Sequence, residues 1–202
     1  MKTRILLLCI ASLTLSIAAH GQELDGAEMK EFAQAMGAMM GAGSNAVPVA
    51  DFREMKALLP AALTDMKRTK ASGEKTGAMG MIVSYAEATY ESDSGGTIEI
   101  KITDNSGLGA LMALSQAGWT TMEIDQETET GYERTTTIGG AKALEKYDSA
   151  DRSGEIQIMV DNRFMVQATG SGVEAAAVKA AVEAIDLKKL AGIKPKAATT
   201  PP

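Results

Sequence analysis

The sequence predicts an α+β domain, in which an antiparallel sheet of roughly six strands carries helices packed on one face. Three observations support this fold class. Apolar and polar residues alternate strictly at residues 97–102 (TIEIKI) and again at residues 156–160, as in strands with one buried face. Turn-forming residues separate neighbouring alternating runs. Helical patterns precede, divide and follow groups of strands, an order that favours an antiparallel sheet over a parallel one.

A secretory signal peptide at residues 1–21 is predicted ahead of the domain. Lys2 and Arg4 give it a positively charged start, and the apolar run that follows is too short to cross a bilayer comfortably. Small residues after the run favour cleavage after Gly21, and cleavage after Ala19 is the alternative. We therefore expect the protein outside the cytoplasm, in the periplasm or the extracellular space.

Cleavage of this peptide changes the chemistry that the chain can perform. Cys9 is the only cysteine and His20 the only histidine, so a chain that begins at Gln22 has no thiol and no imidazole. Cysteine nucleophiles, serine–histidine hydrolases and the usual zinc sites are thereby excluded. Loss of two basic residues leaves 20 − 2 = 18 against 26 acidic ones, a net charge of −8, which disfavours nucleic-acid binding.

Residues 22–41 are predicted to form an amphipathic helix, and residues 42–50 (AGSNAVPVA) a linker that tethers it to the domain. Thioether sulfurs could hold Cu(I) in an exported compartment, but Phe32 continues the same apolar stripe, as packing requires and a copper site does not. We predict no metal and no cofactor. The stripe supplies the candidate partner-binding residues, which are Met29, Phe32, Met36, Met39 and Met40.

The domain itself is predicted at residues 51–191, with a disordered tail at residues 192–202. Asp51 and Glu54 have the spacing of a capping box and open a short helix that Pro60 ends. A hairpin follows, with its strands at residues 84–90 and 97–102, and then a helix at residues 108–118. Two further strands are expected on either side of Gly139 and Gly140.

The last part of the domain shows a second hairpin and a closing helix. Asp161 and Asn162 tolerate a left-handed turn between two alternating runs. Ser171 and Glu174 have capping-box spacing ahead of a helix. Its inward face is predicted to comprise Val178, Ala181, Val182 and Ile185.

Two parts of the sequence are alike, since residues 90–105 resemble residues 147–162. One interpretation is a pair of α-plus-hairpin repeats. The alternative is that any two hairpins with polar turns share these features.

Three segments also resemble other proteins: Leu58-Leu59-Pro60 before a basic strand, the hairpin at residues 160–166 (VDNRFMV), and the closing segment at residues 185–190 (IDLKKL). They are similar to uncharacterised exported bacterial proteins with a PsbP/Mog1-like α/β sandwich. The resemblance covers roughly residues 51–190. It implies a fold and a compartment, and no catalytic residue.

Acidic residues offer the remaining candidates for a site. Asp125, Glu127 and Glu129 recur with period two, which would place three carboxylates on one strand face where a cation such as Ca²⁺ could bind. The spacing does not fit an EF-hand loop, and a solvated edge strand explains the same residues. We therefore assign no metal site.

The hypothesis that these observations favour is a non-catalytic exported protein that binds a protein partner or an apolar ligand in the cell envelope. One alternative is a hydrolase or lyase that uses carboxylates alone, for which Asp104, Asp125, Glu127 and Asp161 are the candidates. Another is a carrier of lipid or of another small apolar ligand. We expect no integral membrane segment in the mature chain.

Mass spectrometry of the exported chain tests the predicted cleavage. We expect an N-terminus at Gln22, because small residues stand at the preferred positions before it. A chain that begins at His20 would contradict this cleavage and would place an imidazole beside the N-terminal amine, a pair that can chelate copper.

Overall fold

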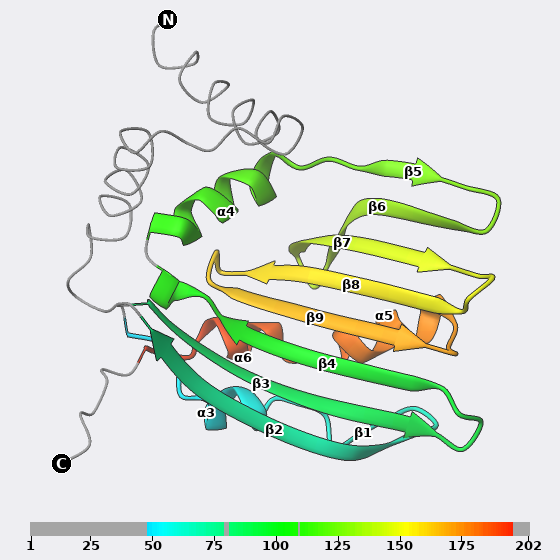
Figure 1. Cartoon of the computed structure of the whole chain (residues 1–202), viewed down its shortest axis with the longest axis horizontal. Coiled ribbons are helices and arrows are strands. Elements are labelled where there is room, and N and C mark those ends of the chain that lie inside the picture. Colours follow the sequence, from blue (N-terminus) through cyan, green and yellow to red (C-terminus); the bar gives the residue numbers. More distant parts are fainter. Residues whose placement is uncertain (1–47, 79–80, 109, 196–202) are drawn as a thin grey trace, which may run out of the picture. The chain divides into compact units, whose positions relative to one another are not determined.

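A computed structural model describes residues 48–78, 81–108 and 110–195. The predicted signal peptide and the helix at residues 22–41 lie outside the described residues. Nine strands form one antiparallel sheet in the order β1-β2-β3-β4-β9-β8-β7-β6-β5 (Figure 1). The strands are β1 (Ala62–Leu63), β2 (Met66–Ala78), β3 (Met81–Ser92), β4 (Thr97–Asp104), β5 (Asp125–Glu127), β6 (Gly131–Ile138), β7 (Ala141–Asp148), β8 (Ser153–Val160) and β9 (Phe164–Ser171).

The prediction of an antiparallel sheet is confirmed, but the expected number of six strands was wrong. β1 and β5 are too short to produce a periodic pattern in the sequence. β2 (MKRTKASGEKTGA) begins with the buried Met66, but beyond it only small residues, Ala71 and Gly73, stand where a strand with one buried face would carry large apolar side chains. About half of the described residues are in strands and about a fifth in helices, so the sheet dominates this part of the chain.

Helices cover one face of the sheet only in part. α3 (Phe52–Lys56) packs against β2 and β3, α5 (Ala175–Glu183) against β4, β8 and β9, and α6 (Leu187–Ala191) against β8. A 3-10 turn, η1 (Ser106–Leu108), leads into α4 (Ala110–Thr121). α4 does not join the other helices: Lys142 Nζ donates to the carbonyls of Thr120 (3.0 Å) and Met122 near its end. The expectation that the helices share one face was therefore wrong for α4.

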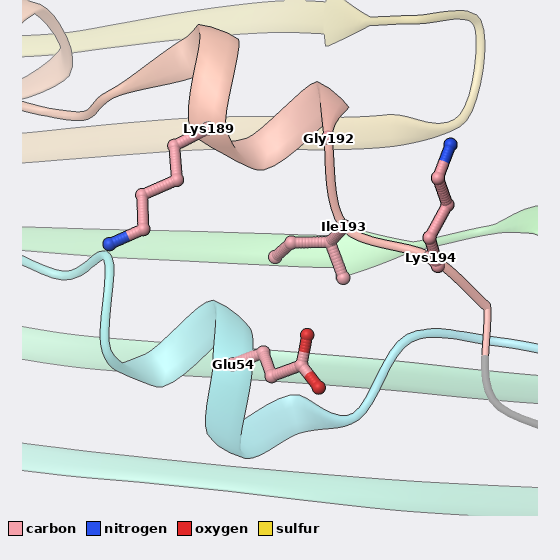
Figure 2. Close-up of a pocket in the computed structure, with 5 residues that line it drawn as sticks. All are labelled: Glu54, Lys189, Gly192, Ile193 and Lys194. Atoms are coloured by element: carbon pink, nitrogen blue, oxygen red, sulfur yellow. The ribbon is translucent and has the colours of Figure 1, made fainter.

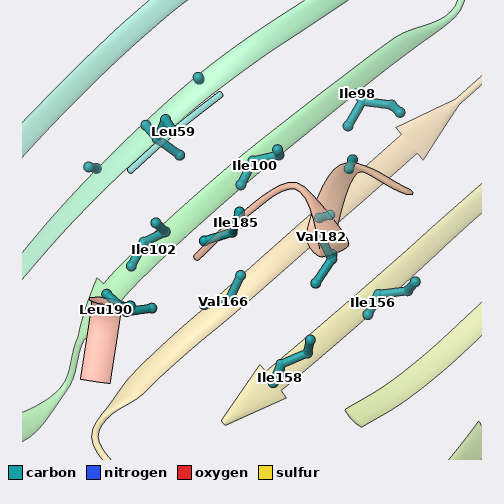
Figure 3. Close-up of a cluster of buried hydrophobic side chains, with 14 of the residues drawn as sticks. Leu59, Ile98, Ile100, Ile102, Ile156, Ile158, Val166, Val182, Ile185 and Leu190 are labelled. Carbon is teal, nitrogen blue, oxygen red and sulfur yellow. The ribbon is translucent and has the colours of Figure 1, made fainter. Parts of the chain in front are cut away.

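The core lies between the sheet and α3, α5 and α6 (Figure 3). Period-two alternation turns Ile98, Ile100 and Ile102 of β4 toward the helices, as predicted from the sequence. The register brings Ile100 beside Ala168 of β9, and Ala168 beside Ile156 of β8, so apolar rows cross the sheet. Above these rows lie the buried side chains of Val178, Ala181, Val182, Ile185 and Leu190.

A two-residue turn closes the β6–β7 hairpin, and a three-residue turn at residues 161–163 closes the β8–β9 hairpin. Asp161 and Asn162 have φ values of 52° and 49° between β8 and β9, and Gly139 and Gly140 have 59° and 83° between β6 and β7. Positive φ at these turn positions matches the right-handed twist of the flanking strands. Both hairpins are confirmed.

The start of α5 differs from the prediction. Ser171 does not form a capping box, because it is the last residue of β9. Glu174 is the N-cap residue of α5, and its side chain makes no capping hydrogen bond. The inward positions of the helix are as predicted.

The similar segments at residues 90–105 and 147–162 occupy corresponding places in the sheet. They form the β3–β4 and β7–β8 hairpins, and β4 and β8 flank β9 on its two sides. Tyr90 and Tyr147 are buried, and their hydroxyls donate to the carbonyls of Pro60 (2.8 Å) and Val173 (3.1 Å). Each tyrosine thus anchors a neighbouring loop to the sheet.

Glycines bring α5 close to the sheet, and this contact gives a test of the fold. A Cβ on Gly170 would lie 2.5 Å from Val178 Cγ2 and 2.6 Å from Val173 Cγ2. We expect Gly170→Ala to lower the free energy of unfolding by about 1–3 kcal/mol, because the core has no room for the methyl group. Gly118→Ala is the matched control: nothing lies within 4 Å of its Cβ position, so stability should rise by up to ~1 kcal/mol. Urea denaturation measures both, and equal effects would contradict this packing.

Candidate functional site

The structure places the predicted site residues apart. Met29, Phe32, Met36, Met39 and Met40 lie outside the described residues, so their role stays a prediction. Asp104 is fully buried at the end of β4, whereas Asp125, Glu127 and Asp161 are exposed on β5 and in the β8–β9 turn.

Both carboxylate oxygens of Asp104 accept hydrogen bonds from other parts of the fold. Its carboxylate accepts from the backbone N–H groups of Ala50 (2.5 Å) and Ser106 (3.0 Å). Arg163 donates from Nε to Oδ1 at 3.1 Å and from Nη2 to Oδ2 at 2.6 Å, and from Nη1 to the carbonyl of Ile193 at 2.9 Å. Burial raises the pKa of Asp104, but these hydrogen bonds, above all those from Arg163, lower it overall.

A second buried carboxylate is also fully paired. Glu145 of β7 accepts from the Tyr132 hydroxyl at 2.7 Å and from Arg134 Nε and Nη2 at 3.1 and 2.9 Å. Desolvation and the hydrogen bond to Glu145 raise the pKa of Tyr132 to about 12, so this phenol stays protonated. Neither buried acid has an oxygen free to act on a substrate, which removes the geometric basis for carboxylate catalysis at these two positions.

The acidic residues at positions 125–129 lie at the margin of the sheet, and they do not converge on a site for a cation. Asp125 and Glu127 are on β5, Glu129 follows in the turn, and all three side chains are exposed. Among the described residues, no three Asp, Glu, His or Cys side chains are grouped closely enough to hold a metal ion.

Two surface hollows are too open to define a ligand. One lies between α3 and the segment after α6 and is lined by Glu54, Lys189, Gly192, Ile193 and Lys194 (Figure 2). Its charged side chains are at least partly exposed, so it offers no desolvated polar group to orient a ligand. The other, of about 400 Å³, runs beside α5 and is lined mainly by the alanines Ala62, Ala176, Ala177, Ala180, Ala181 and Ala184.

The face of the sheet away from α5 carries a polar network across β2, β3 and β4. The Tyr85 hydroxyl donates to Glu74 at 3.0 Å, and Lys101 Nζ lies 4.3 Å from the centre of the Tyr85 ring. Lys101 also lies 3.7 Å from Glu87, which accepts from the Ser72 hydroxyl at 2.9 Å. The hydrogen bond to Glu74, followed by desolvation, raises the pKa of Tyr85. These side chains satisfy one another and keep the face polar.

The outer edge of β2 is open over most of its length. β3 pairs with β2 from residue 66 to residue 78 except at Thr69, where the register shifts, but β1 pairs only with Met66 and Lys67. From residue 68 to residue 78, nothing else in the described chain pairs with this edge, and Figure 1 shows it at the margin of the sheet. Lys70, Lys75 and Thr76 are exposed along it. Such an edge presents backbone N–H and C=O groups that an additional strand can bind.

The two margins of the sheet carry opposite charges. Residues 66–78 contain four basic side chains and one acidic one, a net charge of 4 − 1 = +3, in a protein that is acidic overall. Residues 123–130 contain four acidic side chains and no basic one. The side chains are Lys67, Arg68, Lys70, Glu74 and Lys75 at the first margin, and Glu123, Asp125, Glu127 and Glu129 at the second.

Sequence reasoning missed both the buried ion pair and the open edge. The alternation Ile98, Ile100, Ile102 continues to position 104, which is a signal that Asp104 points inward. A basic stretch at residues 67–75 within an acidic chain is the corresponding signal for β2. Nothing in the sequence identifies Arg163 as the partner of Asp104, because 59 residues separate them.

Comparison of the chain with family models, with curated proteins and with solved structures finds no match. No helix in the described part of the chain is both long enough and apolar enough to cross a membrane.

Acid denaturation tests the role of Asp104. Its pKa is lowered in the folded state, so its contribution to stability is complete above the unfolded value and is lost as the pH falls through the folded value. We expect Asp104→Asn to cost about 3–5 kcal/mol near neutral pH, because Arg163 loses its buried charge partner. The difference from wild type should shrink below about pH 4.

The control for this experiment is Asp161→Asn, an exposed turn position with φ of 52° that asparagine tolerates. It should change stability by less than ~0.5 kcal/mol. Thermal unfolding followed by circular dichroism at several pH values gives both results. A constant difference between Asp104→Asn and wild type from neutral to strongly acidic pH would contradict the assignment.

Proposed function

We propose that this chain is an exported, non-catalytic binding protein that captures an extended acidic segment of a partner protein along the open edge of β2. The observation that carries the proposal is the edge itself, from residue 68 to residue 78, which no strand of the described chain covers. Its compartment follows from the predicted signal peptide. The helix at residues 22–41 is a further candidate contact in this proposal.

Strand addition explains how such an edge could bind without a pocket. An extended partner segment would form main-chain hydrogen bonds with β2, and these supply affinity with little dependence on sequence. β2 is held on its other side by pairing with β3, which is unbroken from Lys70 to Ala78. The ordering cost on binding would then fall mainly on the partner.

Charge supplies the selectivity in this proposal. Lys70 and Lys75 are exposed beside the edge and make no ion pair within the described chain, so an incoming carboxylate would meet uncompensated positive charge. The same lysines repel a basic segment and discourage indiscriminate pairing of exposed edges. The non-catalytic part of the proposal is supported by Asp104 and Glu145, whose oxygens are consumed by internal hydrogen bonds.

A peptide-binding measurement tests the proposed function. The probe is a fluorescein-labelled ten-residue peptide of alternating Thr and Glu, compared with a Thr and Lys peptide of the same length. We expect the acidic peptide alone to bind and to slow backbone amide exchange at residues 70–78. The variant K70E/K75E should bind at least tenfold more weakly. Each substitution removes an exposed attraction of about 0.5 kcal/mol and adds a repulsion of about 0.5 kcal/mol, so the two together cost about 2 kcal/mol.

The matched control is K179E/K188E, which makes the same change in net charge on exposed positions of α5 and α6. It should retain nearly all of the binding, because these residues do not border β2. Equal binding of the acidic and basic peptides would contradict the proposal. Equal losses in the two double variants would also contradict it, since they would indicate a general effect of net charge.

A further inference from the structure

We infer that the acidic margin at residues 123–130 of one copy supplies the segment that the β2 edge of a second copy binds, so that the protein associates head to tail. The inference rests on the proposed function, because it uses the same edge of β2. It adds the identity of the partner, which is another molecule of this chain.

The acidic margin has the backbone geometry of an available edge strand. Thr135 N donates to the carbonyl of Ile124 at 2.7 Å, and Thr128 N donates to the carbonyl of Gly131 at 2.8 Å. Ile124 and Thr128 therefore turn their backbone groups toward β6. Because antiparallel pairing alternates, Asp125 and Glu127 between them turn their N–H and C=O groups outward.

The charges of the two margins select this pairing among the possible edge contacts. Two open β2 edges would bring Lys70 and Lys75 of both copies together, and two β5 edges would bring carboxylates together. Both like-with-like contacts are repulsive, whereas the open edge of β2, residues 68–78 with a net charge of 3 − 1 = +2, meets four carboxylates at the β5 edge. Charge complementarity therefore excludes the symmetric dimers and leaves the mixed contact.

A mixed contact has a defined consequence for assembly. Each copy carries one edge of each kind, at opposite ends of the strand order, so the contact is heterologous and leaves an unused edge at both ends of a pair. The segment that β5 presents is short, so each contact should be weak. Its attraction is between exposed charges and should weaken strongly with salt.

Analytical ultracentrifugation of the full signal-cleaved chain tests the inference. At low ionic strength we expect the weight-average mass to rise with protein concentration, and at 0.5 M NaCl to fall to that of the monomer. The variants K70E/K75E and E123K/D125K/E127K/E129K should each be monomeric at low salt. A variant with all six substitutions carries a net charge of 1 − 3 = −2 on residues 68–78 and of +4 on residues 123–130, so the two margins attract once more and it should associate again.

The controls separate misfolding from loss of contact. Each variant is checked by its melting temperature, and the neutral variant K70Q/K75Q replaces the reversal if that substitution unfolds the domain. It should also reduce association. Restored association in the variant with six substitutions is not an outcome that misfolding could produce.

Two results would overturn the inference. The first is a wild-type chain that is monomeric at every concentration and salt; binding of the Thr and Glu peptide to β2 would then leave the proposed function standing. The second is association that neither charge reversal affects, which would place the contact on another surface. Failure of peptide binding together with a monomeric chain would remove both proposals.

Discussion

The folded domain depends on one buried ion pair. Asp104 and Arg163 lie 59 residues apart, and their pairing fixes the end of β4 against the turn between β8 and β9. Burying two charges is costly, and the cost is offset here because the carboxylate also accepts from Ala50 and Ser106 while the guanidinium also donates to Ile193. This ion pair and its hydrogen bonds therefore form a single junction, which connects the centre of the sheet to the segment before α3 and to the segment after α6.

The two faces of the sheet differ in character. The helix-covered face is apolar at its centre and holds the remaining buried carboxylate, Glu145, beyond the helices in a pairing with Tyr132 and Arg134. The opposite face is polar, and its charged side chains are largely satisfied by their neighbours across β2, β3 and β4. The margin of the sheet stays available for a partner. A new strand could pair there without disturbing the core or the Asp104–Arg163 ion pair.

The sequence predicted those parts of the fold in which a local pattern coincides with burial. Alternation identified β4 and β8, and the Asp161-Asn162 and Gly139-Gly140 turns marked two hairpins, because their chemistry requires positive φ. β2 and β5 gave no such pattern, since β5 is a short exposed strand and β2 beyond Met66 carries only small or polar residues. The pairing of the two margins with opposite charges depends on strand order, which no local pattern contains.

The described chain enters and leaves the domain at the same place. Ala50, near its start, binds the carboxylate of Asp104, and Ile193, near its end, binds the guanidinium of the residue paired with it. A mechanical load applied between the two ends would therefore act first across a few hydrogen bonds around one ion pair. The backbone hydrogen bonds between the long strands would carry little of that load until the ion pair and the hydrogen bonds around it had broken.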